Sequence, residues 1–311
     1  MTWQTEVTQV CGLGESPFWH PDEQMLYWID IPARQLHRLN VFTGSVQSWT
    51  MPTEPGSIAP ASTSGEASGL VIALRDGIYR AREWGGNLQL LVAAGHDIRT
   101  TRFNDGKADP CGRFWAGTMY EPRDIPSAQL FSLDVRNGQT PELIRKAGDA
   151  TIANGLAWSP DAGTVYWADT PSHSIRAWDW DPDTSAMTRE RIFMKFPGKP
   201  AGWQPGKPEM TAYGGRPDGA AVEVQGNYYV AMFEGGRLLK ISPAGEVLAD
   251  IPVPARCPTM ACFGGSDLKT IYLTTARDGR PEAELLAWPD SGCVFSMRVE
   301  VPGLPVNFFL D

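Results

Sequence analysis

The sequence has few residues of the kinds that build thiol-based or histidine-based sites. It contains five cysteines and four histidines among 311 residues. The cysteines are scattered, odd in number and lack a Cys-x-x-Cys spacing, so we expect neither a disulfide framework nor a zinc site with thiolate ligands. The histidines show no His-x-His or His-Glu-x-x-His spacing, which excludes the common histidine-based zinc motifs. This use of cysteine favours a reducing compartment, and we expect a cytoplasmic protein.

Several other signals are absent. No apolar run is long enough to span a bilayer, and the first residues have neither the basic start nor the apolar core of a signal peptide. No Gly-x-Ser-x-Gly elbow or phosphate-binding P-loop occurs. The net charge is −9, with 27 basic against 36 acidic residues. An acidic chain argues against nucleic acid and anionic membranes as partners. We expect a monomer or weak homo-oligomer that acts on a small molecule.

The residues that are abundant indicate many short strands joined by tight turns. There are 32 glycines, 26 prolines and 12 tryptophans. A unit recurs six times, in which a polar residue precedes an apolar run, and a turn and an aromatic-rich run follow. The clearest parts of the six units lie at residues 18–44, 68–80, 109–133, 156–178, 221–241 and 260–297.

Repeats of roughly forty to sixty residues with three or four short strands each are typical of β-propeller blades. We therefore predict an all-β protein, a six-bladed β-propeller that forms one domain over residues 1–311 with a metal site in its central channel. Residues 1–10 alternate in polarity and are expected to supply the strand that closes the last blade. One or two stacked β-sandwiches are the alternative.

One segment interrupts the repeats. Residues 195–208 are too rich in proline and glycine for a strand or a helix, and so we predict a loop. A long loop that leads into Asp218 is a candidate lid, with Trp203 and Tyr213 available to contact substrate. A surface excursion that touches nothing is the alternative.

The start of each innermost strand faces one mouth of the channel in a propeller, and all six residues expected there carry an oxygen. They are Glu15, Ser68, Asn104, Asn154, Asp218 and Thr259. Two carboxylates with neutral oxygens suit Ca²⁺, Mg²⁺ or Mn²⁺, and Zn²⁺ is tolerated but not favoured by such ligands. Asx-Gly pairs also form turns for purely local reasons, which is the alternative for each position taken alone.

Four segments resemble the senescence marker protein (regucalcin), gluconolactonase and luciferin-regenerating enzyme family. They are Gly14-Glu15-Ser16-Pro17, the long stretch from Arg102 to Met119, Ala153-Asn154-Gly155-Leu156 and Pro217-Asp218-Gly219. The resemblance implies a six-bladed propeller with one divalent metal, held by Glu15, Asn154 and Asp218. It also implies substrate contacts at Arg102 and Asn104, and it points to Glu121 for a substrate hydroxyl.

Members of that family mostly hydrolyse sugar lactones, which the resemblance implies here as well. A cation would polarise the lactone carbonyl and acidify the attacking water. Asp218 is the candidate general base, Arg102 would orient substrate, and Asn104 would hold the water or the developing oxyanion. Hydrolysis of other esters or phosphotriesters, and a non-enzymatic role in calcium binding or as a scaffold, remain alternatives. The sequence does not identify the sugar.

Overall fold

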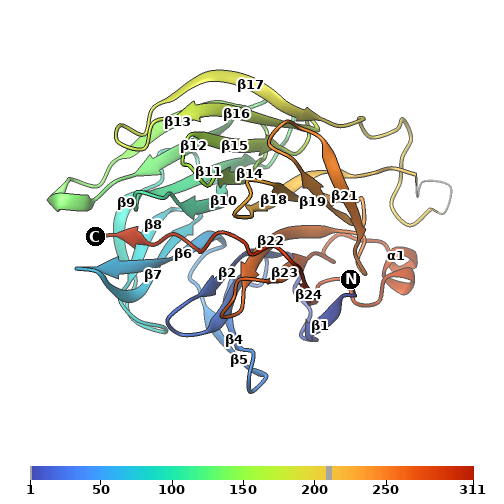
Figure 1. The fold of residues 1–311 in the computed structure, drawn as a ribbon, viewed down its shortest axis with the longest axis horizontal. Helices are drawn as coiled ribbons and strands as arrows, with labels where there is room; N and C mark the ends of the chain where they lie inside the picture. The colour runs from blue at the N-terminus through green and yellow to red at the C-terminus, as the bar shows by residue number, and fades with distance from the viewer. Residues whose placement is uncertain (1, 208–211) are drawn as a thin grey trace.

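A computed structural model describes residues 2–207 and 212–311, and its strands form six sheets around a central axis (Figure 1). Five sheets have four strands, and the sixth has five. The predicted all-β, six-bladed propeller is thereby confirmed, and the β-sandwich alternative is wrong. Within the described residues, none of the helices has the length and apolar character needed to cross a bilayer.

Each blade begins with its innermost strand, and the next three strands follow outward in chain order. The first blade contains β2 (Gly14–His20), β3 (Met25–Asp30), β4 (Gln35–Asn40) and β5 (Ser45–Thr50). The second contains β6 (Pro55–Thr63), β7 (Glu66–Leu74), β8 (Gly77–Ala81) and β9 (Gln89–Ala93). The third contains β10 (Thr101–Ala108), β11 (Phe114–Tyr120), β12 (Ala128–Leu133) and β13 (Leu143–Ala150), with the short 3₁₀ helix η1 (Arg136–Gly138) before its last strand.

The remaining blades follow the same order. The fourth contains β14 (Ala153–Trp158), β15 (Thr164–Asp169), β16 (Ser174–Trp180) and β17 (Met187–Lys195). The fifth contains β18 (Arg216–Val222), β19 (Tyr228–Phe233), β20 (Arg237–Ile241) and β21 (Val247–Pro252). The sixth contains β22 (Pro258–Gly264), β23 (Thr270–Thr275) and β24 (Val294–Arg298), with α1 (Glu282–Ala287) between its second and third strands.

The two ends of the chain join different blades. β1 (Gln4–Val7) pairs antiparallel with β24, so the N-terminal segment supplies the outer strand of the sixth blade, as predicted for residues 1–10. β25 (Phe309–Leu310) pairs parallel with β6 and extends the second blade. Figure 1 shows the two termini on opposite sides of the ring. The ring is thus closed by strand pairing, because the sixth blade is completed by the start of the chain.

The second blade differs from the sequence prediction. Its innermost strand is β6, whereas Ser68 lies in β7. There the Ser68 hydroxyl accepts a hydrogen bond from Arg80 Nη2, with an N–O distance of 2.6 Å. Pro55 and Pro60 made β6 look unlike a strand, since proline is confined to edge strands, bulges and strand starts. The stretch of β6 that contains the two prolines is such an edge, because β25 pairs only with Ala61 and Ser62. The register shift in β6 spans Gly56, so this blade offers no side-chain oxygen at the position predicted for Ser68.

Aromatic side chains fill the space between neighbouring blades. The rings of Trp115, Trp158 and Trp180 meet edge to face with centroids 5.5–6.4 Å apart, which joins the third blade to the fourth. The edge-to-face arrangement is favoured by the ring quadrupoles and adds to the free energy gained by burial. By contrast, the outermost strand β5 is largely exposed. The polar channel is therefore surrounded by a rigid apolar layer.

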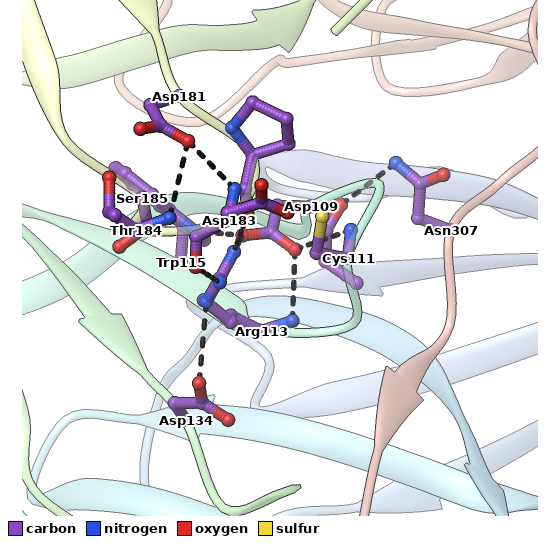
Figure 2. A network of polar contacts seen from close by, with 12 residues as sticks. Asp109, Cys111, Arg113, Trp115, Asp134, Asp181, Asp183, Thr184, Ser185 and Asn307 are labelled. Carbon is purple, nitrogen blue, oxygen red and sulfur yellow. Dashed lines mark hydrogen bonds and ion pairs between the residues drawn. The ribbon is translucent and has the colours of Figure 1, made fainter.

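The turn between β10 and β11 is built around the buried carboxylate of Asp109 (Figure 2). It accepts hydrogen bonds from the backbone N–H of Cys111 at 2.8 Å and of Arg113 at 3.0 Å, and from Trp115 Nε1 at 2.8 Å. The Arg113 guanidinium also donates to the carbonyl oxygen of Asp183 in the fourth blade at 2.8 Å. The second half of the long Arg102–Met119 stretch therefore stabilises the fold.

Candidate active site

One pocket of about 110 Å³ opens at the mouth of the channel where the innermost strands begin. The predicted residues that line it are Glu15, Arg102, Asn104, Asn154 and Asp218. They come from β2, β10, β14 and β18, which belong to four different blades. Four of the six residues predicted from the repeats thus line one pocket, whereas Ser68 and Thr259 do not.

Irregular strand pairing accompanies each of these four positions. Register shifts fall between Glu15 and Phe18 in β2 and between Phe103 and Gly106 in β10. Equivalent shifts fall between Asn154 and Ala157 in β14 and between Pro217 and Ala220 in β18. A β-bulge locally bends a strand and redirects its side chains. The four innermost strands thus share the feature that turns polar side chains toward the channel.

The glycines that follow two of these residues are required by close packing. Gly155 has a φ of 61°, and a Cβ added there would lie 2.4 Å from Tyr228 Oη. A Cβ at Gly219 would lie 2.4 Å from the Cβ of Met260. Asn154-Gly155 and Asp218-Gly219 lie within β14 and β18, so the alternative interpretation of these pairs as turns is wrong. The glycines allow the neighbouring blade to approach behind the site residues.

The carboxylates of Glu15 and Asp218 are held in an environment that disfavours their charge. The two residues are 7% and 5% exposed. Burial raises the pKa of Glu15 well above its ordinary value, and the charges of Asp218 and Asp105 raise it further. Burial likewise raises the pKa of Asp218, and the attraction of Arg216 only partly offsets this effect. Two buried carboxylates in one pocket create a demand for a positive charge between them.

A chain of hydrogen bonds fixes the two amides of the site. Arg102 Nη1 donates to Asn104 Oδ1 at 2.7 Å, and Asn104 Nδ2 donates to Asn154 Oδ1 at 2.9 Å. Asn154 Nδ2 then donates to Thr170 Oγ1 at 2.7 Å, and Thr170 donates to the carbonyl of Pro217 at 2.7 Å. This order directs the Asn154 oxygen toward the pocket with one lone pair free for a ligand. The Asn104 oxygen is already bonded to Arg102.

These side chains fit a divalent hard cation. Glu15, Asn154 and Asp218 offer side-chain oxygens from three blades. Within the described residues, the buried carboxylates of Glu15 and Asp218 form no ion pair with a lysine or an arginine. Oxygen ligands of this kind suit Ca²⁺. In the described part of the chain, no group of three or more His, Cys, Asp or Glu side chains could hold a metal. The candidate set differs from such a group because one of its three ligands is an amide.

Glu121 stands apart from the other predicted residues. It follows β11 and receives a two-pronged ion pair from Arg75, with N–O distances of 2.9 and 3.0 Å. Its carboxylate lies 3.9 Å from Nε of Arg102. Glu121 thus affects the site only by its charge near Arg102, and its contact with a substrate hydroxyl stays a prediction. Thr259 Oγ1 donates to the carbonyl of Gly14 at 2.5 Å and does not line the pocket.

Three polar residues of the pocket were not predicted from the sequence. Thr170 orients Asn154, while Arg123 and Arg216 bring two positive charges to the wall of the pocket. Thr170 follows the second strand of its blade, and Arg123 lies in a loop, so neither falls at the repeat position that marked the other residues. Arg216 lies two residues before Asp218 in the same strand, and this spacing could have indicated from the sequence that Arg216 lines the pocket.

The predicted lid does not line the pocket. Lys199 pairs with Glu234 at 2.6 Å, and the Trp203 ring meets the Tyr213 ring with centroids 5.3 Å apart. Tyr213 is buried and bonded to His173 Nε2 at 2.6 Å. Pro208, at the end of the predicted loop, lies outside the described residues. The described part of the loop packs beside the site, which argues against an excursion that touches nothing, and closure over substrate stays a prediction.

A second cavity, of about 240 Å³, lies at the other end of the channel. It is lined by the later residues of all six innermost strands and by the C-terminal segment 304–307. Its lining includes the half-buried Lys107 but no carboxylate. Although this cavity is larger, the acidic ligands and the hydrogen-bonded amides belong to the first pocket. We therefore place the chemistry at the first pocket.

The fold and the pocket together define a six-bladed β-propeller with an oxygen-lined polar site in its channel. Residues 13–277 match the family described as the SMP-30/Gluconolactonase/LRE-like region, and the chain belongs to this family. The resemblance stated from the sequence motifs is thereby confirmed.

Named relatives cover nearly the whole chain. It is 42% identical over 308 residues to a 6-deoxy-6-sulfogluconolactonase of Pseudomonas putida, with 99% of this chain and 98% of the relative covered. Human regucalcin is 32% identical over 295 residues, with 92% and 91% covered. A crystal structure of a calcium-binding protein, regucalcin, from Agrobacterium tumefaciens superposes with a TM-score of 0.88. It covers 99% of this chain and 97% of that one at 23% identity, which shows the fold alone.

Proposed function

We propose that this protein hydrolyses a sugar lactone to the free aldonic acid with the help of one divalent cation held by Glu15, Asn154 and Asp218. The observation that carries the proposal is the convergence of these three oxygens with Arg102 and Asn104 in one buried pocket. Ca²⁺ is the favoured cation on ligand type, and Zn²⁺, Mn²⁺ and Mg²⁺ are the others to be tested. The cytoplasmic location stays a prediction.

The predicted enzyme class is a hydrolase of carboxylic esters of the lactonase type. This prediction is confirmed by the family match over residues 13–277 and by 42% identity to a sulfogluconolactonase over 99% of the chain. The dependence on a cation and the roles of single residues are the parts that we add as proposals. They are supported by the buried carboxylates and by the ordered amides of the pocket.

The cation, when bound, would polarise the lactone carbonyl and stabilise the negative charge that develops on its oxygen. Arg102 presents a guanidinium at the pocket and orients the ring and hydroxyl oxygens of the substrate. Burial lowers the pKa of Arg102 to about 10, and the charge of Glu121 raises it. Arg102 therefore stays protonated at neutral pH and remains a hydrogen-bond donor.

Asp218 serves as the general base that accepts a proton from the attacking water. Burial raises its pKa in the absence of a cation, and a bound cation would offset that rise and keep the carboxylate ionised, the form that can accept a proton. Asn104 keeps its orientation through Arg102 and Asn154, and the remaining lone pair of its Oδ1 can accept a hydrogen bond from the water. Its Nδ2 already donates to Asn154 and to the carbonyl of Ala153, so this amide has no donor left for the developing oxyanion. The opened ring leaves as the aldonate with release of one proton to solvent at neutral pH.

Proton release at constant pH tests the proposed function. The substrates are aldonolactones, compared with aryl esters and phosphotriesters, and the proteins are the wild type and Asp218→Ala. We expect release above the spontaneous rate with one lactone as the best substrate, and loss of nearly all activity in Asp218→Ala. Faster turnover of phosphotriesters would assign a different hydrolysis to the same pocket. If no substrate is turned over but Ca²⁺ binds, the protein is a calcium-binding protein without this activity.

A further inference from the structure

The wall of the pocket carries three guanidinium groups beside its two ligand carboxylates. Arg102, Arg123 and Arg216 all line it. Arg102 is engaged by Asn104 and by the carbonyl of Phe103, at 2.7 and 2.9 Å. The other two guanidinium groups have incomplete partners. They are the strongest unexplained feature of the pocket.

Arg123 presents its charge to the pocket without a protein partner. Within the described residues, its guanidinium makes no hydrogen bond or ion pair, while its backbone N–H donates to the carbonyl of Tyr120 at 3.2 Å. The residue is exposed, so its charge is accessible to a ligand that enters the pocket.

Arg216 is held in place but is only partly neutralised. Its Nη2 lies 3.3 Å from Glu234, and its guanidinium lies over the Phe233 ring at 5.3 Å. Its Nε atom is buried and has no hydrogen-bond partner within the described part of the chain. Glu234 also pairs with Lys199 at 2.6 Å and with Arg280 at 3.0 Å. Arg280 is also paired with Glu284 at 2.7 Å, so two carboxylates serve three cations and the cluster keeps an excess of positive charge.

The two incompletely paired arginines repel each other. Burial lowers the pKa of Arg123 and the nearby charge of Arg216 lowers it further, while Glu121 and Glu234 partly offset both effects. Because Arg123 is exposed, water screens much of this repulsion, and an anion bound between the two guanidinium groups would be attracted by both. The cation that Glu15, Asn154 and Asp218 would hold increases the positive charge of the pocket, so it does not remove this attraction. An anionic group of the ligand would satisfy both guanidinium groups.

We infer that the sugar lactone carries an anionic substituent away from the reacting carbonyl, and that Arg123 and Arg216 bind its oxygens. This inference rests on the proposed function for the rest of the substrate. Guanidinium groups bind oxyanions through paired, charge-assisted hydrogen bonds. A sulfonate, a phosphate and a carboxylate share this chemistry. The donors and the buried Nε of Arg216 therefore form a subsite for the substituent, separate from the groups that act on the carbonyl.

The test compares neutral and anionic lactones on the intact, cation-loaded protein. Substrates are glucono-1,5-lactone, its 6-phospho and 6-deoxy-6-sulfo derivatives, and a lactone of glucaric acid. We expect kcat/KM at least tenfold higher for one anionic lactone than for the neutral lactone. Arg123→Gln and Arg216→Gln should each reduce this preference about 10- to 100-fold, the effect of losing a hydrogen bond between charged groups. Arg99→Gln, an exposed surface change, is the control and should leave the preference unchanged.

The anionic lactone with the highest kcat/KM identifies the substituent as sulfonate, phosphate or carboxylate. Equal kcat/KM for the neutral lactone and every anionic one would overturn the inference. Binding of the corresponding stable aldonates, measured by calorimetry, tests the subsite without turnover. Tighter binding of an aldonate that carries a second anionic group than of gluconate, lost in both arginine variants, supports the subsite even if no lactone is hydrolysed and the proposed function fails. Equal binding of gluconate and the aldonates with a second anionic group would overturn it.

Discussion

Replacing Asp218 by asparagine should change the stability of the protein in opposite directions with and without a divalent cation. The residue is 5% exposed, and its pKa is raised well above the ordinary value because burial outweighs the attraction of Arg216. A carboxyl group whose pKa is higher in the folded than in the unfolded state lowers stability at every pH above the unfolded value. At pH 8 the charge of Asp218 therefore destabilises the protein that holds no cation.

The magnitude follows from the burial. A buried charged group without sufficient partners costs at least about 1–3 kcal/mol. Asp218→Asn should raise the free energy of unfolding in chelator by about that amount. Since 1 kcal/mol shifts the melting temperature of a chain of 150–250 residues by roughly 2–4 °C, we expect a rise of a few degrees in this somewhat longer chain. The stabilisation by the cation, about 4.1 kcal/mol at a thousandfold excess over Kd, should be lost, so that the variant is the less stable protein in Ca²⁺.

Calorimetric melting of the wild type and the variant in chelator and in Ca²⁺ measures both effects. Asp97→Asn is the matched control, because Asp97 is an exposed partner of Arg99 and its replacement should leave both melting temperatures unchanged. A lower melting temperature of Asp218→Asn in chelator would refute the argument that this charge is unfavourable. A full Ca²⁺-induced shift in the variant would remove Asp218 from the ligand set.

Three further predictions concern other parts of the molecule. Arg102→Ala should raise KM and lower kcat while Ca²⁺ affinity measured by titration stays the same, and a parallel loss of Ca²⁺ would make Arg102 a support for the ligands. Asp109→Ala should lower the free energy of unfolding by about 3–5 kcal/mol, because it removes one of the two carboxylates of the buried Arg113 and leaves the Trp115 indole N–H and two backbone N–H groups without their acceptor. A loss below 1 kcal/mol in denaturant titration would contradict this. Ca²⁺ affinity should fall as the pH is lowered from neutrality, because the raised pKa values of Glu15 and Asp218 let protons compete with Ca²⁺ at a higher pH than at exposed carboxylates. An affinity that is constant from pH 8 to pH 5 would contradict this prediction.

The ring of blades could be predicted because each blade repeats a local pattern. Short aromatic-rich strands and the polar residue before them recur at one position, so Glu15, Asn154 and Asp218 were found without knowledge of their contacts. The second blade was misplaced because Pro55 and Pro60 hide its innermost strand. An edge strand tolerates proline, and nothing local distinguishes such a strand from a loop.

The positive wall of the pocket could not be predicted in this way. Arg123 lies in a loop, and Arg216 acquires its environment from Glu234 and Arg280, which are distant from it in the sequence. The Arg216 guanidinium is incompletely paired because it shares the carboxylate of Glu234 with Lys199 and Arg280. Such sharing depends on how blades five and six pack, and a repeat pattern within a single blade carries no information on that contact.

The measurement that tests the central claim most directly is proton release by protein stripped with a chelator, before and after cations are restored. The metal content of the stripped protein is verified first, and Ca²⁺, Mg²⁺, Mn²⁺ and Zn²⁺ are then added back singly with the best lactone as substrate. We predict that hydrolysis falls to the spontaneous rate in the stripped protein and returns with at least one cation, with Ca²⁺ favoured by the oxygen ligands. Full activity in the verified metal-free protein would contradict the assignment of Glu15, Asn154 and Asp218 as ligands of a catalytic cation.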